Sequence, residues 1–161
     1  MSKILISSCL LGLNTRYDGK NKLNEKLVEL ARNKQIVFVC PEQLSGLSTP
    51  REPAEIEAGK SSKDVLEGNA RVITISGNTQ TKEFLIGAQK TLDLCKSLDI
   101  KVAILKENSP SCASNNVYDG TFKGGKIPGT GVVAELLKQN GITVYNEDNY
   151  PLSLFDSTKQ I

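Results

Sequence analysis

The residues best suited to chemistry in this 161-residue chain are its four cysteines, Cys9, Cys40, Cys95 and Cys112. No two of them form a C-x-x-C pair, so their linear spacing gives only a weak signal for a metal site. The chain contains no histidine, which excludes Ser-His-Asp and Cys-His nucleophile pairs and histidine-ligated zinc or iron. Thiolates without histidine suit a soft metal or an iron–sulfur cluster. Such a site requires a fold that brings several of the thiols together.

The hydropathy pattern indicates which elements position these thiols. Apolar runs typical of buried strands occupy residues 4–8, 36–39, 71–75, 101–105 and 142–145. Helical spacing occupies residues 22–33 and 131–139, and a longer helix, capped by Thr79 or Thr81, is expected to run to about residue 98. Residues 41–69 and 106–129 are expected to form long loops. The alternation of strands and helices is typical of a parallel sheet that is covered on both faces.

We therefore predict an α/β fold: a small single domain with a mostly parallel, Rossmann-like sheet of about four to five strands and helices on both faces. The domain is expected to span residues 1–146, and residues 147–161 to form a C-terminal tail. Apolar side chains are expected to dock that tail, namely Tyr150, Leu152, Leu154 and Phe155.

This topology brings three of the cysteines to one edge of the sheet. Cys9 and Cys40 directly follow the first two strands, and Cys112 lies in the loop after residues 101–105. Ligands of open parallel sheets bind outside the carboxyl ends of the strands. Three thiolates on a four-iron cluster would leave one iron open as a Lewis acid. The alternative is that these cysteines only pack in loops, as Cys95 is expected to pack on the apolar face of its helix.

Two polar residues stand close to these thiols in the sequence. Glu42 follows Cys40 by two residues, and beside a cluster its carboxylate could carry protons. Ser109 precedes Cys112 by three residues, and Pro110 keeps it out of helical geometry. The alternatives are a solvated loop glutamate and an ordinary Ser-Pro turn.

Further motifs are weaker. Two Tyr-Asp-Gly turns, at residues 17–19 and 118–120, could present a carboxylate or a phenol to a ligand, although most Asp-Gly pairs are only turns. The Pro-Gly-Thr-Gly run at residues 128–131 opens a helix and could offer backbone N–H groups to an anion. It lacks the Walker lysine, so a nucleotide phosphate site has little support. The length of the loop at 106–129 favours a functional role, because loops beyond about 12–15 residues are usually functional or disordered.

The composition of the chain limits the classes of partner that it could bind. The net charge of +2 and the absence of tryptophan give no footprint for a nucleic acid polymer. No apolar run approaches the ~18 residues of a membrane span, and the N-terminus has no small-residue cleavage site. We therefore expect a cytoplasmic protein with no membrane partner.

Six motifs occur in one order along the chain: SSCLLGLNTRYDG, VCPEQLSGLSTPREPAEI, KEFLIGAQKTLDL, ILKENSPSC, YDGTFKGGKIPGTGV and NGITVYNE. Together they resemble the bacterial thiouracil desulfidase family, formerly catalogued as a domain of unknown function. The likeness extends from residue 3 to about residue 147. Each motif alone is weak, but the ordered set is specific.

The resemblance implies a [4Fe-4S] cluster on Cys9, Cys40 and Cys112, whose free iron binds the sulfur of a thiolated pyrimidine base. It implies hydrolytic, non-redox removal of that sulfur, which gives uracil and hydrosulfide. Glu42 and Ser109 match the catalytic pair of the family. The partner would then be a small thiolated molecule, either a free base, a nucleoside or a related compound.

We add three candidate substrate-binding residues from the motifs near the thiols, namely Asp18, Ser111 and Tyr118. One alternative function is a non-catalytic cluster- or anion-binding module, such as a redox sensor. Another is a zinc-binding structural protein, which three cysteines support poorly because structural zinc sites normally use four ligands.

Overall fold

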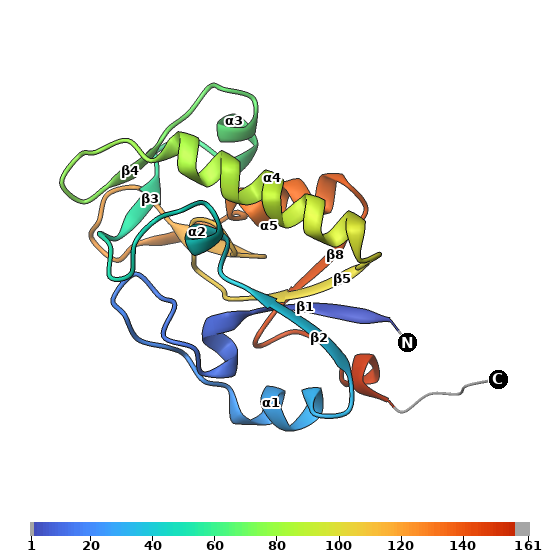
Figure 1. Cartoon of the computed structure of the whole chain (residues 1–161). Coiled ribbons are helices and arrows are strands. Elements are labelled where there is room, and N and C mark those ends of the chain that lie inside the picture. The colour runs from blue at the N-terminus through green and yellow to red at the C-terminus, as the bar shows by residue number, and fades with distance from the viewer. Residues whose placement is uncertain (1, 157–161) are drawn as a thin grey trace.

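A four-stranded parallel sheet forms the centre of this computed structural model, which describes residues 2–156 (Figure 1). Its strands are β1 (Lys3–Ser7), β2 (Gln35–Val39), β5 (Val102–Leu105) and β8 (Thr143–Asn146), in the spatial order β2-β1-β5-β8. In the register, Ile4 lies opposite Ile36 on one side and Val102 on the other. The chain therefore runs from β1 to one edge of the sheet and then returns across it to β5 and β8. This arrangement confirms the predicted parallel α/β sheet.

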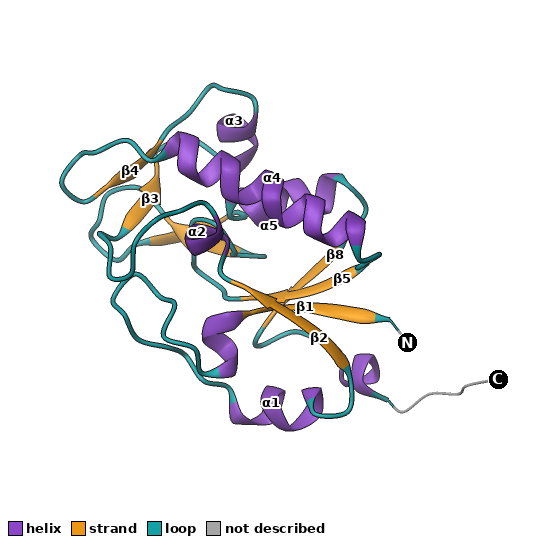
Figure 2. Cartoon of the chain, in the orientation of Figure 1, coloured by secondary structure: helices purple, strands orange, loops and turns teal. Residues whose placement is uncertain are grey.

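Helices cover both faces of the sheet, as predicted (Figure 2). Helices α4 (Thr81–Ser97) and α5 (Val132–Gln139) lie on one face, and α1 (Glu25–Ala31) lies on the other. Leu5 of β1 is fully buried in the core under α4 and α5, while its neighbours Ile4 and Ile6 belong to the core under α1. The central strands β1 and β5 carry continuous apolar runs, Ile4–Ile6 and Val102–Leu105, because both of their faces are covered.

The helices begin where local chemistry satisfies their first N–H groups. The Asn24 side chain accepts the N–H of Leu27 at 2.9 Å and caps α1. Neither Thr79 nor Thr81 caps α4, so that prediction is wrong. The first residue of α4 is tied to an adjacent strand instead, because the Thr81 hydroxyl accepts the N–H of Val72 at 3.0 Å.

The prediction of a long loop at residues 41–69 is wrong. This stretch contains three short elements: α2 (Pro41–Leu44), β3 (Ala54–Ile56) and α3 (Ser62–Leu66). The strand expected at residues 71–75 exists as β4 (Val72–Thr74), but it pairs antiparallel with β3 in a separate two-stranded sheet. The loop expected at 106–129 contains a hairpin of β6 (Asn116–Tyr118) and β7 (Lys126–Pro128). The missed elements combine three to five residues with mostly polar or mixed sequences, so they show neither an apolar run nor a hydrophobic period.

Two further expectations, one about β2 and one about the C-terminal tail, differ from the structure. Strand β2 has the composition of a buried strand, but it is an edge strand, and Phe38 is 53% exposed. In the tail, Tyr150, Leu154 and Phe155 pack on the α1 side, whereas Leu152 is 54% exposed. Residues 157–161 of the predicted tail lie outside the described part of the chain. Among residues 2–156, no helix is both long and apolar enough to cross a membrane.

Candidate functional site

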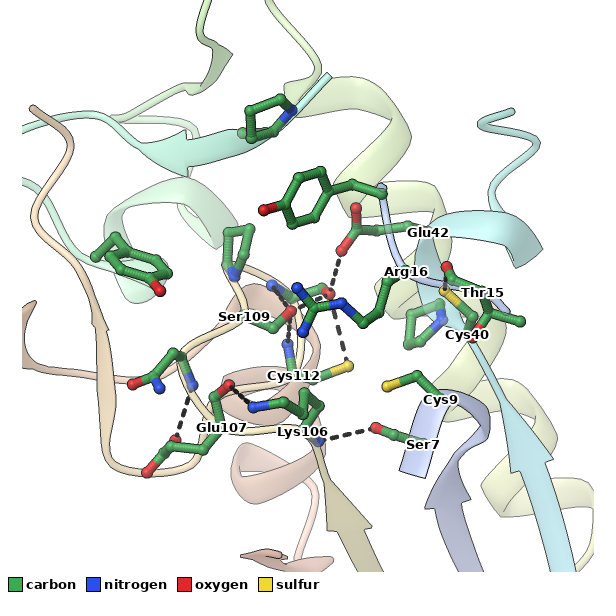
Figure 3. A pocket seen from close by; sticks show the side chains of 18 of the residues that line it. Ser7, Cys9, Thr15, Arg16, Cys40, Glu42, Lys106, Glu107, Ser109 and Cys112 are labelled. Carbon is green, nitrogen blue, oxygen red and sulfur yellow. Dashed lines mark hydrogen bonds between the residues drawn. The ribbon is translucent and has the colours of Figure 1, made fainter. Parts of the chain in front are cut away.

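A pocket of about 510 Å³ lies at the carboxyl ends of β1, β2 and β5 (Figure 3). The crevice at this edge, where the strand order reverses, is the usual ligand site of an open α/β sheet. Its lining includes all the residues of the predicted metal and catalytic sets, namely Cys9, Cys40, Cys112, Glu42 and Ser109. It also includes two of the three predicted substrate-binding residues, Ser111 and Tyr118.

Three elements supply the three thiols. Cys9 lies in the short 3-10 helix η1 (Ser8–Leu11) after β1, Cys40 is the N-cap of α2 directly after β2, and Cys112 lies in the turn after β5. Figure 3 shows the side chains of Cys9 and Cys112 pointing toward one another, with Cys40 beside them at the end of β2. All three are free cysteines, and Cys9 and Cys112 are buried. Cys95 is fully buried in the core under α4 and α5, as expected.

The protonation of these thiols depends on what they contact. Burial raises the pKa of Cys112 to about 12 and the pKa of Cys9 to about 11. Burial also raises the pKa of Cys40, against the opposing charge of Arg51. Thiolates are the form that binds metals. The three groups therefore suit a strongly cationic partner, such as iron, that holds them deprotonated.

The donor set fits an iron–sulfur group better than a single ion. Within residues 2–156, no three histidine, cysteine, aspartate or glutamate side chains are placed to hold one metal ion. The three thiols nevertheless line one pocket from three separate elements. A multi-iron cluster takes each thiolate on a different iron, so it can use ligands that one ion could not.

Two glycines let the loops of the site contact the helices directly. A Cβ atom at Gly87 in α4 would overlap the carbonyl oxygen of Pro41, which lies between Cys40 and Glu42 in the sequence. This glycine therefore lets the start of α2 pack directly against α4. A Cβ atom at Gly131, at the start of α5, would overlap the backbone of Ser111.

The turn that carries Cys112 uses the first N–H groups of α5. The N–H of Val132 donates to the carbonyl of Pro110 at 2.8 Å, and the N–H of Val133 donates to the carbonyl of Ser111 at 2.9 Å. The suggestion that this helix start could offer N–H groups to an anion is therefore wrong, because these donors already hold the turn.

Glu42 and Ser109 lie in one hydrogen-bonded chain, but Ser111 stands between them. The Ser111 hydroxyl donates to Glu42 Oε2 at 2.9 Å and lies 2.9 Å from the Ser109 hydroxyl. Ser109 Oγ also accepts the N–H groups of Ser111 and Cys112, each at 3.1 Å. The predicted pair is thus brought together through a residue that we expected to bind substrate.

The two Tyr-Asp-Gly turns have different positions. Asp18 is outside the pocket lining and holds Arg16 of the lining by an ion pair at 3.3 Å. Hydrogen bonds from Arg16 and from the backbone of Lys20 lower the pKa of Asp18 despite some desolvation. Tyr118 lies on β6 in the pocket wall, with Lys126 Nζ 5.6 Å from the centre of its ring.

The wall at Tyr118 is the β6–β7 hairpin, which is tied to the small β3–β4 sheet. The Glu55 carboxylate is buried and its Oε1 accepts the N–H of Gly120 at 2.9 Å and that of Phe122 at 3.3 Å. A Cβ atom at Gly120 would overlap the backbone of Ala58, so the tip of the hairpin lies directly on the chain after β3.

Sequence reasoning missed several charged residues of the lining, among them Arg51 and Glu107. Arg51 has a side chain that is 5% exposed and forms an ion pair with Glu42 at 3.0 Å. Glu107 is 8% exposed and accepts hydrogen bonds from the loop around Cys112. Charged residues are almost never buried without a partner. The partners here lie far away in the sequence, so the local signals were only a proline-flanked arginine and the end of a strand.

The chain is similar to a family of known proteins, to a curated relative and to a solved structure. Residues 4–149 match the family described as 2-thiouracil desulfurase. The uncharacterized protein YbbK of Bacillus subtilis (strain 168) is 50% identical over 145 residues, which cover 90% of this chain and 95% of that protein. A solved structure of the "[4Fe-4S]-dependent thiouracil desulfidase TudS" matches with a TM-score of 0.83 at 40% identity, over 96% of this chain and 97% of that one.

Proposed function

The chain belongs to the 2-thiouracil desulfurase family, and from this premise we propose that it hydrolyses the carbon–sulfur bond of a small thiolated pyrimidine with the help of a [4Fe-4S] cluster. The family match confirms the resemblance seen in the sequence, and the TM-score of 0.83 confirms the fold. Together the family and the solved relative indicate an enzyme that removes sulfur from thiouracil. The observation that carries the mechanism is a carboxylate and two hydroxyls, joined by hydrogen bonds, at the pocket where three thiols meet.

Cys9, Cys40 and Cys112 are the residues that would hold the cluster. When bound, the cluster would supply a Lewis acid that captures the soft sulfur of the substrate. This assignment is supported by the position of the three thiols, which reach one pocket from three separate elements, whereas Cys95 lies outside its lining. The absence of histidine leaves these thiols as the soft donors of the pocket. Free thiols also suit a reducing compartment, so we place the protein in the cytoplasm.

Glu42 is the proposed proton carrier. Its Oε2 accepts the Ser111 hydroxyl, and its Oε1 accepts from Arg51, so the carboxylate is held in one orientation at the pocket. Water adds to the thiocarbonyl carbon and gives a proton to this carboxylate. Glu42 then gives this proton to the sulfur and takes up the proton of the new hydroxyl as the carbon–sulfur bond breaks, so that a C=O bond forms and hydrosulfide leaves. No electron is gained or lost over the reaction.

The hydroxyls of Ser109 and Ser111 complete the proposed site. Ser109 Oγ already accepts two backbone N–H groups, so its own proton can be donated to Ser111, whose proton in turn faces Glu42. This chain holds Glu42 in place and offers a polar edge to the base. The substrate would lie between this edge and Tyr118 on the opposite wall, and Asp18 would act indirectly by holding Arg16.

The test begins with protein purified and reconstituted without oxygen. Iron, sulfide and visible absorbance are measured first, and the protein is then incubated with 2-thiouracil and 4-thiouracil while uracil and sulfide are followed. We expect about four irons and turnover with release of sulfide. Iron uptake without turnover would favour the non-catalytic redox sensor, and a colourless protein without iron would rule out the cluster.

A matched pair of variants assigns the ligands. Cys112→Ala should lose the cluster, because the remaining two thiols cannot replace the third. Cys95→Ala should keep it, because Cys95 is buried in the core under α4 and α5. Equal iron content in the two variants would contradict the proposed ligand set.

A further inference from the structure

Arg51 forms the densest set of side-chain contacts in the wall of the pocket. Its Nε donates to Glu42 Oε1 at 3.0 Å, and one terminal nitrogen donates to the carbonyl of Thr15 at 2.9 Å and lies 3.7 Å from Cys40 Sγ. The other terminal nitrogen donates to Thr49 Oγ1 at 3.0 Å. The side chain is 5% exposed, so these contacts replace nearly all of its water.

These contacts join parts of the chain that the sheet does not connect. Thr15 lies in the loop after η1, which carries Cys9, while Cys40 and Glu42 lie at the start of α2. The carbonyl of Thr15 accepts from both Arg51 and the Cys40 thiol, the latter at 3.5 Å. One guanidinium therefore fixes the position of a thiol, a carboxylate and the loop between two thiols.

We propose that Arg51 is a positioning residue that holds the Glu42 carboxylate in its working orientation and donates a hydrogen bond to the sulfur of Cys40. This inference rests on the proposed function, in which Glu42 carries the proton and Cys40 binds the cluster. It goes further by making both roles depend on one cation.

The energetics of buried ion pairs support orientation as the role of Arg51. A buried pair loses about as much solvation energy as it gains in attraction, so such a pair is weak evidence for stability alone. The planar guanidinium has five donors in a rigid fork, whereas a lysine ammonium acts as a single flexible charge. Only a side chain with several donors in such a fork can contact Glu42, Cys40 and Thr15 at the same time. With Oε1 held by Arg51, Oε2 of Glu42 is directed to Ser111.

The test compares Arg51→Lys, Arg51→Met and a matched control, Arg71→Met. Arg71 forms an ion pair with Glu57 at 3.3 Å, but its side chain is 58% exposed and lies outside the pocket lining. Each protein is reconstituted without oxygen. Iron and sulfide content, the midpoint potential of the cluster, and kcat and KM with thiouracil are then measured.

We expect Arg51→Met to keep its iron but to lose about a hundredfold in kcat, with a smaller change in KM, because the proton carrier is no longer aligned. Arg51→Lys should keep the charge and still lose about tenfold, because one ammonium cannot make the three contacts. The midpoint potential should become more negative in both, since a hydrogen bond to a ligand sulfur is removed. Arg71→Met should match the wild type in every measurement.

Wild-type kcat and potential in Arg51→Lys would overturn the inference, and this variant decides the question if Arg51→Met does not fold. A KM increase with unchanged kcat would also overturn it, because that pattern reports substrate binding and not alignment. A wild type that takes up iron but shows no turnover contradicts the proposed function, and the potential then tests the contact to Cys40 by itself. A wild type that takes up no iron overturns both.

Discussion

Glu42 and Glu107 are two of the carboxylates that line the pocket, and their hydrogen-bond donors differ in kind. Glu107 accepts from the main chain, through the N–H groups of Ser114 at 2.9 Å and Asn115 at 3.1 Å, and from the buried Asn146 amide at 2.9 Å. Among the described residues, the Glu42 carboxylate accepts only from side chains, the Ser111 hydroxyl and the Arg51 guanidinium. Main-chain donors cannot leave without unfolding the loop, whereas a hydroxyl donor such as that of Ser111 can rotate during a reaction. This difference supports a structural role for Glu107 and the proposed proton transfer at Glu42.

The largest expected effect separates the two residues by turnover. Glu42→Gln keeps the shape of the side chain but removes the basic oxygen, so kcat should fall about 10²- to 10⁴-fold. Its iron content should stay near the wild-type value, whereas its stability should fall because the buried Arg51 guanidinium loses its counter-charge. Steady-state kinetics with thiouracil on the reconstituted protein measure the loss. Turnover close to wild type would show that the proton goes elsewhere.

The next effect is on folding. Glu107→Ala leaves the amides of Ser114, Asn115 and Asn146 without their acceptor, so the free energy of unfolding should fall by about 3–5 kcal/mol. Urea denaturation of the apo protein measures this change, with Arg71→Met, which removes only an exposed ion pair, as the control of smaller effect. If Glu107→Ala unfolded at the same urea concentration as this control, the structural role of Glu107 would be wrong.

A smaller effect is expected where the Cys112 turn meets α5. Gly131→Ala places a Cβ atom against the backbone of Ser111, and overpacking of this kind costs about 1–3 kcal/mol. Because the displaced turn carries Cys112, iron uptake should fall with stability. Gly129→Ala is the control, since its Cβ atom would meet only the Val117 side chain, at 3.1 Å. Similar iron uptake in both variants would show that the turn tolerates displacement.

The smallest expected effect is a loss of stability at α1, and it shows whether lower stability alone changes turnover. Asn24→Ala removes the cap of α1, on the face of the sheet opposite α4 and α5, and should cost about 1 kcal/mol of stability. Its kcat should equal that of the wild type, because α1 does not line the pocket. A loss of kcat here would mean that stability alone alters turnover, and the result for Glu42→Gln would need correction for it.

Sequence reasoning succeeded where local patterns are long. The four strands of the sheet and the helices α1, α4 and α5 follow from apolar runs and helical spacing, and the meeting of Cys9, Cys40 and Cys112 follows from that topology. Glu42 and Ser109 were singled out by their distance from a cysteine, and their pairing came from the resemblance to a family.

What sequence reasoning missed depends on contacts across long separations. Arg51 meets Thr15 across 36 residues, and Glu107 meets Asn146 across 39. Neither contact has a local signature, because the side chains are brought together by the packing of elements that are themselves short. The exposed edge position of β2 also depends on strand order, which residue types along one strand do not reveal.

The β6–β7 hairpin has a consequence for how such a protein can change over generations. The thiols lie on segments joined directly to the sheet and to α4 and α5, while the hairpin is an insertion between β5 and α5 whose tip is anchored by Glu55 to the β3–β4 sheet. Residues of this insertion, including Tyr118, Phe122 and Lys126, shape one wall of the pocket. Replacements there would change the shape of this wall without touching the segments that carry the thiols. The wall and the thiols can therefore vary independently, so under the proposed function one reaction could be kept while the substrate changes.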